Sequence, residues 1–297
     1  MKRTFILVTL CFLLIIVSAC SSRSLYILTD QYWYETYLNE AGIQTGIEKI
    51  AVKNGYNRTA IEIIQVNGKE QENLSLYKKI SNNDIILLSP LLSIHTAAIR
   101  KNYPGIKMIA FGDPVPDGIK TNMIDGLYLI YFDRTEAFKE AGSKAVQFLT
   151  GKGGLGILFY TGTENRKREI RAFLDSFTET GGSNAFLTLT VDNLDKRKEI
   201  QDFLNEVKTR NITLLLLAVS ELNSYCMDIL APHDVLIITE NLIKSSIWES
   251  KIFLSIELDF MSAIDSALKA AKDGSEHRIT VPAKIIPGKS EPEIEKN

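Results

Sequence analysis

Short apolar runs alternate with amphipathic segments along most of the chain. The clearest case starts at the apolar run Gly126–Phe132, after which Phe138, Ala141 and Ala145 recur at helical spacing. A second apolar run, Leu155–Tyr160, precedes a second helical pattern that ends at Phe177. Strand, helix, strand and helix in alternation predict a parallel sheet with helices on both faces.

Similar units lie on both sides of this segment. The other predicted strands are Leu25–Leu28, Ala60–Val66, Asp84–Leu88, Lys107–Phe111, Ala185–Val191, Ile212–Val219, Val235–Thr239, Ile252–Ile256 and His277–Ile286. Helices are expected at 32–54, 70–81, 95–103, 194–210, after Ser220, and at 260–272. The central unit is therefore interpreted as the crossover between two α/β lobes.

The first twenty residues have the layout of an export signal. Lys2 and Arg3 precede the 13-residue apolar core Phe5–Val17, which is short for a helix that spans a bilayer. Val17–Ser18–Ala19–Cys20 resembles the bacterial lipobox, in which a peptidase cleaves before a cysteine that becomes lipidated. We therefore expect a lipoprotein signal peptide at 1–19 and a lipid on Cys20. The alternatives are an uncleaved signal anchor, or an ordinary signal in which Cys20 is incidental, and either one still exports the chain.

Composition and charge narrow the possible functions. The chain has 297 residues, is 45% hydrophobic, and carries 34 basic and 36 acidic residues without a basic tract, so we predict no nucleic-acid partner. After loss of residues 1–19 and lipidation of Cys20, Cys226 would be the one remaining thiol, which cannot form an internal disulfide. His95, His233 and His277 show no metal-ligand spacing, and no nucleophile elbow or phosphate-binding loop is present. We predict a non-enzyme with no catalytic residue, no metal and no cofactor.

Several local patterns together resemble the type I periplasmic binding proteins, which include ribose and galactose receptors, nucleoside-binding lipoproteins and the ligand domains of LacI-like repressors. Asp133 with the following Ala-rich helix looks like the first hinge segment and crossover helix of that family. Arg166–Phe173 looks like the basic helix of its second lobe, with Ala172 in place of the usual glycine. Val235–Asn241 resembles the strand that ends near a ligand-binding Asp, and Ile252–Asp259 the return to the first lobe. The resemblance covers about 260 residues.

The resemblance implies an α/β fold of two doubly wound Rossmann-like lobes joined by hinge strands. The expected N-terminal lobe is 24–133 with 258–280, the C-terminal lobe is 134–257, and 281–297 forms a hinge strand and a disordered tail. The implied function is a lipid-anchored, extracytoplasmic solute-binding protein that captures a small polar ligand, sugar or nucleoside-like, in a cleft between the lobes and delivers it to an ABC permease. The alternative is a ligand-sensing or protein-interacting lipoprotein of a signalling system. A hydrolytic enzyme on the same fold is a third hypothesis.

Ligands of doubly wound sheets bind at the carboxyl ends of the strands, where loops and helix starts present unpaired N–H groups. The candidate ligand-binding residues at or near strand ends are Tyr32, Trp33, Tyr34, Ser89, Asp113, Asp133, Thr161, Lys167, Ser220, Asn241 and Asp259.

Each candidate has a structural alternative. The three adjacent aromatics either stack on a ligand face or pack in the core. Asp113, like Asp30, either contacts ligand or forms a cap or turn. The resemblance favours Lys167 as the basic residue that reaches the cleft, whereas a solvated basic face is the alternative.

The sequence departs from the family pattern at two positions, and these departures count against a sugar as the ligand more than against the predicted fold. Asp113 is followed by Pro114, where sugar receptors commonly have an arginine, and Ser220 stands where they often have Asn–Asp. Glycine-rich signatures of nucleoside-binding lipoproteins are also absent.

Overall fold

The structure is a computed structural model that describes residues 23–288, apart from 40, 65–79, 91, 94–95, 97–98, 101–103, 112–125, 184–185, 241–245 and 276. Only the backbone is described for residues 32, 36, 41, 186, 221, 246 and 247. Among the described helices, none is both long enough and apolar enough to span a membrane.

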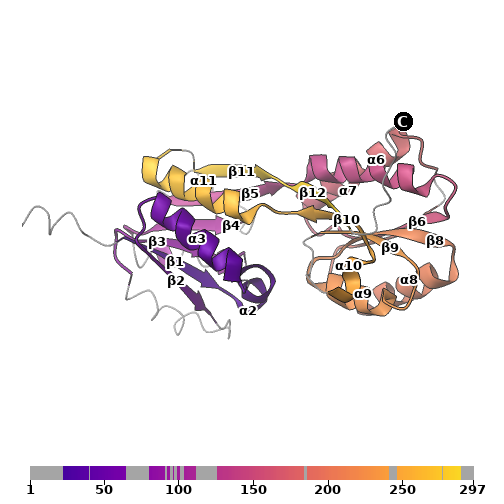
Figure 1. Cartoon of the computed structure of the whole chain (residues 1–297), viewed down its shortest axis with the longest axis horizontal. Coiled ribbons are helices and arrows are strands. Elements are labelled where there is room, and N and C mark those ends of the chain that lie inside the picture. The colour runs from indigo at the N-terminus through magenta and orange to yellow at the C-terminus, as the bar shows by residue number, and fades with distance from the viewer. Residues whose placement is uncertain are drawn as a thin grey trace, which may run out of the picture. The chain divides into compact units, whose positions relative to one another are not determined.

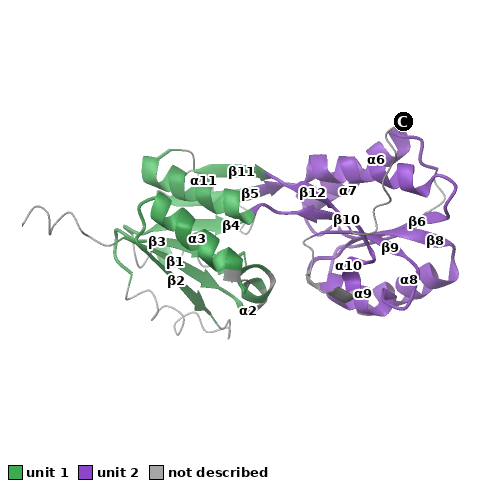
Figure 2. Ribbon diagram, viewed as in Figure 1, with its two compact units in different colours: residues 1–131, 260–281 green, residues 132–259, 282–297 purple. Residues whose placement is uncertain are grey.

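The chain divides into two compact units, residues 1–131 with 260–281 and residues 132–259 with 282–297 (Figure 2). Each unit contains one sheet of six strands. Both units are therefore assembled from segments that are far apart in the sequence, and each closes around its own core.

Unit 1 is a doubly wound sheet with the strand order β11-β5-β4-β3-β1-β2. Its elements are β1 (Ser24–Thr29), α2 (Gln31–Trp33), the π-helix η1 (Tyr34–Leu38), α3 (Ala41–Lys53), β2 (Arg58–Ile63), β3 (Ile85–Leu88), β4 (Lys107–Phe111), β5 (Leu127–Asp133), α11 (Phe260–Asp273) and β11 (Arg278–Pro282). Helices α3 and α11 lie side by side on one face of the sheet (Figure 1). Strand β1 pairs in parallel with both β2 and β3, so the winding direction reverses between β1 and β3.

Unit 2 repeats this plan with the strand order β12-β10-β9-β8-β6-β7. Its elements are α6 (Thr135–Leu149), β6 (Gly154–Tyr160), α7 (Glu164–Glu179), β7 (Phe186–Val191), α8 (Arg197–Thr209), β8 (Ile212–Ala218), the 3₁₀ helix η5 (Ser220–Leu222), α9 (Asn223–Leu230), β9 (Leu236–Glu240), α10 (Ser246–Glu249), β10 (Ile252–Glu257) and β12 (Lys284–Pro287). Strand β6 is parallel to both β7 and β8, so the reversal in this unit lies between β6 and β8. Strand β12 pairs antiparallel with β10 and forms one edge of the sheet.

Strand β8 shows why its apolar run folds as a central strand. Helices α6 and α7 cover one face of the sheet, and α8 and α9 cover the other (Figure 1). Leu214 and Leu216 belong to the core cluster that includes residues of α6 and α7, whereas Leu215 and Leu217 belong to the cluster that includes residues of α8 and α9. Both faces of the strand are thus buried, so its residues are apolar throughout and do not alternate between apolar and polar.

The predicted helix at 32–54 is divided in the structure. Asp30 caps α2 by accepting the Trp33 N–H, the π-helix η1 closes with the Asn39 N–H on the Tyr34 carbonyl, and α3 starts at Ala41. Local hydrogen bonds at Asp30 and Tyr34 interrupt what the apolar spacing alone presents as one helix.

The single extended stretch predicted at 277–286 is also two elements. Strand β11 joins the sheet of unit 1 and β12 that of unit 2, and Ala283 between them donates its N–H to the Asp133 carbonyl. Pro282 ends the first strand because it has no N–H to donate to a ladder. The helix predicted at 70–81 lies almost wholly, and that at 95–103 largely, outside the described residues.

Candidate ligand-binding site

The winding reversal of unit 1 brings the ends of β1 and β3 together at Asp30 and Ser89. Asp30 is 7% exposed and Ser89 is fully buried. One carboxylate oxygen of Asp30 accepts the Trp33 N–H at 2.9 Å, and the other accepts the Ser89 hydroxyl at 2.6 Å. This position is where doubly wound sheets bind ligands, and here it is closed by the unit's own polar groups.

Trp33 lies in a cluster of aromatic rings beside this reversal. Its ring centroid is 5.2 Å from that of Phe111, 5.7 Å from Tyr37 and 5.8 Å from Phe260, and the side chain is 4% exposed. The structure therefore places Trp33 in the core of unit 1. Tyr34 is half-buried, and its hydroxyl accepts a 3.5 Å hydrogen bond from the Gln44 amide.

In unit 2 the reversal is filled by Arg166. Its guanidinium donates to the Tyr160 carbonyl at the end of β6 (3.3 Å) and to the Ala218 carbonyl at the end of β8 (2.9 Å). It also donates two hydrogen bonds to Glu240, of 2.7 and 2.9 Å, and one to Glu169 of 2.8 Å. These five bonds use all five N–H groups of the side chain. The guanidinium lies 4.3 Å from the centre of the Phe159 ring, which adds a cation–π contact.

Arg134 completes a network of four charges. Its side chain donates to Glu169 at 2.9 Å and to Glu240 at 3.2 Å. The side chains of Arg166, Glu169 and Glu240 are at most 5% exposed, and that of Arg134 is 20% exposed. Two arginines and two glutamates balance, so the network has no net charge. We call these four residues the Arg–Glu quartet.

Charge pairing keeps Glu240 ionised. Burial is the largest single influence and would raise the pKa of Glu240, but Arg166, then Arg134, and hydrogen bonds from Arg166 and the Ser220 backbone together hold that pKa below its ordinary value. The quartet thus contains a buried carboxylate that is charged whenever the protein is folded near neutral pH.

Ser220 lies at the end of β8 in a left-handed conformation, with φ of +53°. In that conformation its N–H bonds to the Glu240 carboxylate, and its side chain is exposed. No described residue makes a hydrogen bond to its hydroxyl. Left-handed φ is uncommon for a residue with a side chain and is often retained at functional positions.

The other predicted residues of unit 2 lie in two places. Thr161 is half-buried at the end of β6 and donates its hydroxyl to the Val191 carbonyl at 3.3 Å, whereas Lys167 is exposed and pairs with Glu164 at 2.6 Å. Asp133 and Asp259 mark the ends of the segment that enters and leaves the unit: Asp133 accepts the Thr135 N–H at 3.0 Å, and Asp259 pairs with Lys284 at 2.5 Å. The structure does not describe Cys20, Asp113, Asn241 or the side chain of Tyr32.

Sequence reasoning missed the quartet. Arg166 lies one turn before Ile170 on the same helical face as Phe173 and Phe177, and this spacing was the available signal that it points inward. Its pairing with Glu240, 74 residues away, has no local signature. Within the described ranges, no three His, Cys, Asp or Glu side chains gather as a metal site.

No family model and no curated protein matches the sequence, but many solved structures match its fold. An ABC transporter, LacI-family transcriptional regulator from Brachyspira murdochii aligns with a TM-score of 0.65 at 15% identity, over 90% of this chain and 95% of that one. A solute-binding protein of an ABC transporter system from Conexibacter woesei aligns at 0.64 and 12% identity, over 91% and 90%. A periplasmic solute-binding protein from Actinobacillus succinogenes, solved with bound D-allose, aligns at 0.62 and 14% identity, over 90% and 98%. The chain therefore has the fold of the type I periplasmic binding proteins and of LacI-family ligand-binding domains.

Proposed function

We propose that this chain is a lipid-anchored, extracytoplasmic solute-binding protein that captures a small polar ligand, sugar or nucleoside-like, between its two lobes and passes it to an ABC permease. The observation that carries the proposal is the pair of doubly wound units, each with polar side chains at the strand ends of its winding reversal.

The chemistry of the strand ends favours hydrogen bonding over charge recognition. In unit 2 the quartet neutralises its own charges, and Thr161 and Ser220 add hydroxyl groups at the ends of β6 and β8. In unit 1 the Asp30 carboxylate is already bonded to Ser89 and Trp33. These groups suit a ligand that presents hydroxyl or amide groups to the described strand ends.

The matched structures include both solute-binding proteins and transcriptional regulators, so the fold alone does not choose between carriage and regulation. The amino end favours carriage outside the cytoplasm because Lys2–Arg3 and the apolar core have the layout of an export signal and Val17–Cys20 resembles a lipobox. We infer that Cys20 holds the lipid and that the remainder of the chain functions outside the membrane that anchors it.

Ligand binding is tested by thermal denaturation against a panel of sugars and nucleosides, followed by titration calorimetry of any compound that raises the melting temperature. A ligand that binds only the folded state must raise apparent stability. Ser220→Ala should weaken binding roughly tenfold, whereas Thr178→Ala, which removes an exposed hydroxyl of α7, should leave the affinity unchanged. A panel without any shift, combined with no small molecule copurifying in mass spectrometry, would count against the proposal.

The anchor is tested separately by growing cells with a clickable fatty acid. Wild type and Cys226→Ser should both be labelled, since Cys226 is buried and burial raises the pKa of its thiol to about 12. Cys20→Ser should not be labelled, and its labelling would contradict the assignment.

A second candidate function is a ligand-sensing or protein-interacting lipoprotein of a signalling system. It is favoured by the closure of both winding reversals by internal hydrogen bonds, at Asp30–Ser89 and at the quartet. Crosslinking in intact cells distinguishes the two: capture of a permease supports carriage, and capture of a receptor kinase supports sensing.

A further inference from the structure

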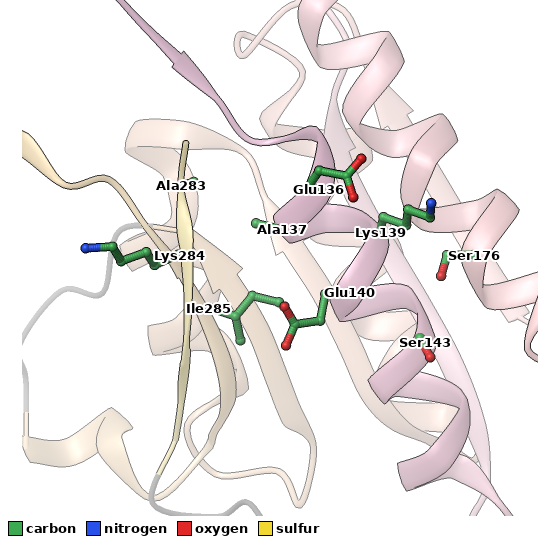
Figure 3. A pocket seen from close by; sticks show the side chains of 9 residues that line it. All are labelled: Glu136, Ala137, Lys139, Glu140, Ser143, Ser176, Ala283, Lys284 and Ile285. Atoms are coloured by element: carbon green, nitrogen blue, oxygen red, sulfur yellow. The ribbon is translucent and has the colours of Figure 1, made fainter. Parts of the chain in front are cut away.

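A cavity of about 700 Å³ that is open to solvent lies on the flank of unit 2, lined by residues of α6, α7 and the edge strand β12 (Figure 3). None of its lining residues belongs to the quartet or to the strand-end candidates. Its volume is within the range of small-molecule sites.

Strand β12, which borders this cavity, presents backbone groups at the open edge of its sheet. Gly288 donates its N–H to the Phe253 carbonyl, so these two residues form a hydrogen-bonded pair between β12 and β10. Successive residue pairs of antiparallel strands alternate between hydrogen-bonded and non-hydrogen-bonded pairs. Ile285 falls on a non-bonded position opposite Ile256, so its N–H and carbonyl point away from β10. Pro287 occupies the next such position and has no N–H, whereas the Ala283 N–H is used by Asp133. Ile285 thus offers one donor and one acceptor at the open edge.

The helical side of the cavity contains a buried hydroxyl. Ser176 of α7 lines the cavity and is 6% exposed, and no described residue makes a hydrogen bond to its hydroxyl. Ser143 on the adjacent helix α6 lines the same cavity, and its hydroxyl is likewise without a partner in the described part of the chain. Buried polar groups in folded proteins are nearly always satisfied, so a hydrogen-bonding ligand suits this position.

Two acidic and two basic side chains line the cavity, Glu136 and Glu140 with Lys139 and Lys284, and Lys284 is paired with Asp259. Figure 3 shows Glu140 pointing toward Ile285 and Lys139 extending toward α7, which carries Ser176. Lys139 makes no ion pair with a described residue, and Glu140 has only a long 3.6 Å contact with Lys144. A molecule with an ammonium group at one end and a carboxylate at the other would pair with both.

We infer that this cavity is a second ligand site, separate from the strand ends, for a short zwitterionic peptide. Its ammonium group pairs with Glu140, its carboxylate pairs with Lys139 and bonds to the Ser176 hydroxyl, and a peptide amide bonds to Ile285. The site depends only on residues of unit 2 and therefore does not require the proposed solute-binding function.

The probe is trialanine, titrated into the purified protein by calorimetry at millimolar concentrations. We expect saturable binding to one site. Lys139→Gln and Glu140→Gln should each weaken it roughly tenfold, the effect of one charge-assisted hydrogen bond, and Ser176→Ala should weaken it roughly threefold. N-acetyl-trialanine amide, which lacks both charges, should bind far more weakly than trialanine.

The matched controls are Lys198→Gln, an exposed lysine of α8, and Ser220→Ala at the end of β8. Both should leave trialanine binding unchanged. Loss of binding in Ser220→Ala with retention in Lys139→Gln would place the peptide at the strand ends and overturn the inference, and so would the absence of saturable binding. A sugar or nucleoside that still binds when trialanine does not would leave the proposed function intact.

Discussion

Among single residues, Glu240 carries a charge that the surrounding fold must neutralise. Its carboxylate is paired with both arginines of the quartet in a nearly solvent-free position. Glu240→Gln keeps the shape but leaves Arg166 and Arg134 with less compensation, so we expect the free energy of unfolding in urea to fall by about 3 kcal/mol. Glu164→Gln is the matched control because it also removes a carboxylate paired with a basic residue of α7, but an exposed one. Equal, small effects of both substitutions would contradict the role assigned to the quartet.

The same carboxylate predicts a pH dependence. Because the pKa of Glu240 is lower in the folded than in the unfolded protein, its stabilising contribution is complete above about pH 4.5, the ordinary glutamate value, and is lost as the pH falls below it. The difference in unfolding free energy between wild type and Glu240→Gln should therefore shrink as the pH is lowered through this range. Urea unfolding of both proteins at a series of pH values measures this difference in free energy. A difference that did not change with pH would show that the charge of Glu240 is not the source of its contribution to stability.

Ser220 combines backbone strain with an exposed hydroxyl, and substitutions can separate the two. A left-handed conformation costs a residue with a side chain roughly 1–2 kcal/mol, and glycine avoids this cost but loses roughly 0.5–1 kcal/mol through its flexibility. We expect Ser220→Gly to leave the unfolding free energy unchanged or to raise it by up to about 1 kcal/mol. Ser266→Gly, in the interior of α11, should lower it by about 0.5 kcal/mol. A clear destabilisation by Ser220→Gly would mean that its side chain contributes to the fold.

The inward or outward direction of a side chain at a strand end depends on local capping as well as on the sequence pattern. The resemblance favoured Lys167, but Thr163 caps α7 through the Arg166 N–H and thereby sets the phase of the helix. That phase turns Arg166 inward and leaves Lys167 in solvent. Helical periodicity could have indicated the buried position, but its partner Glu240 comes from a strand that only the folded sheet brings near.

At the scale of secondary-structure elements, the contact between α6 and α7 depends on Gly142. A Cβ atom there would clash with the Phe173 carbonyl oxygen and lie 3.1 Å from the Phe177 nitrogen, both backbone atoms that cannot yield. Gly142→Ala should therefore lower the unfolding free energy by about 1–3 kcal/mol, although alanine is the better helix former.

The same substitution in α3 is the control. A Cβ atom at Gly42 would meet nothing within 4 Å, so Gly42→Ala should raise the unfolding free energy by up to about 1 kcal/mol. Opposite signs for the two substitutions would establish close helix packing as the cause. A gain in stability at both positions would mean that α6 and α7 can move apart without cost.

The elements that the sequence predicted well are those whose pattern reflects burial on both faces. The run Ile212–Val219 is continuous and apolar, and β8 occupies residues 212–218 of it. Where hydrogen bonding decided the outcome, periodicity was insufficient: the π-helix at Tyr34–Leu38 divides the predicted first helix, and Ala283 divides the last extended stretch. These interruptions depend on backbone partners that apolar spacing does not encode.

At the scale of the whole molecule, the two units can be followed separately because each contains one of the two tryptophans. Trp33 is buried in unit 1 and Trp248 in unit 2. In Trp33→Phe the fluorescence reports unit 2, and in Trp248→Phe it reports unit 1. Adding Glu240→Gln should lower the urea midpoint in the first background and leave it unchanged in the second if the units unfold independently, since all four quartet residues belong to unit 2.

Ligand then provides the decisive comparison for a solute bound between two lobes. A molecule that contacts both units in the folded state should raise the midpoints reported by Trp33 and by Trp248 together, because stabilisation follows binding to each folded unit. Trialanine at the α6–β12 cavity should raise only the midpoint reported by Trp248, since every lining residue lies in unit 2. A sugar or nucleoside that raised only one midpoint would be held by a single unit, and the proposal of capture between lobes would then fail while the fold remained unchanged.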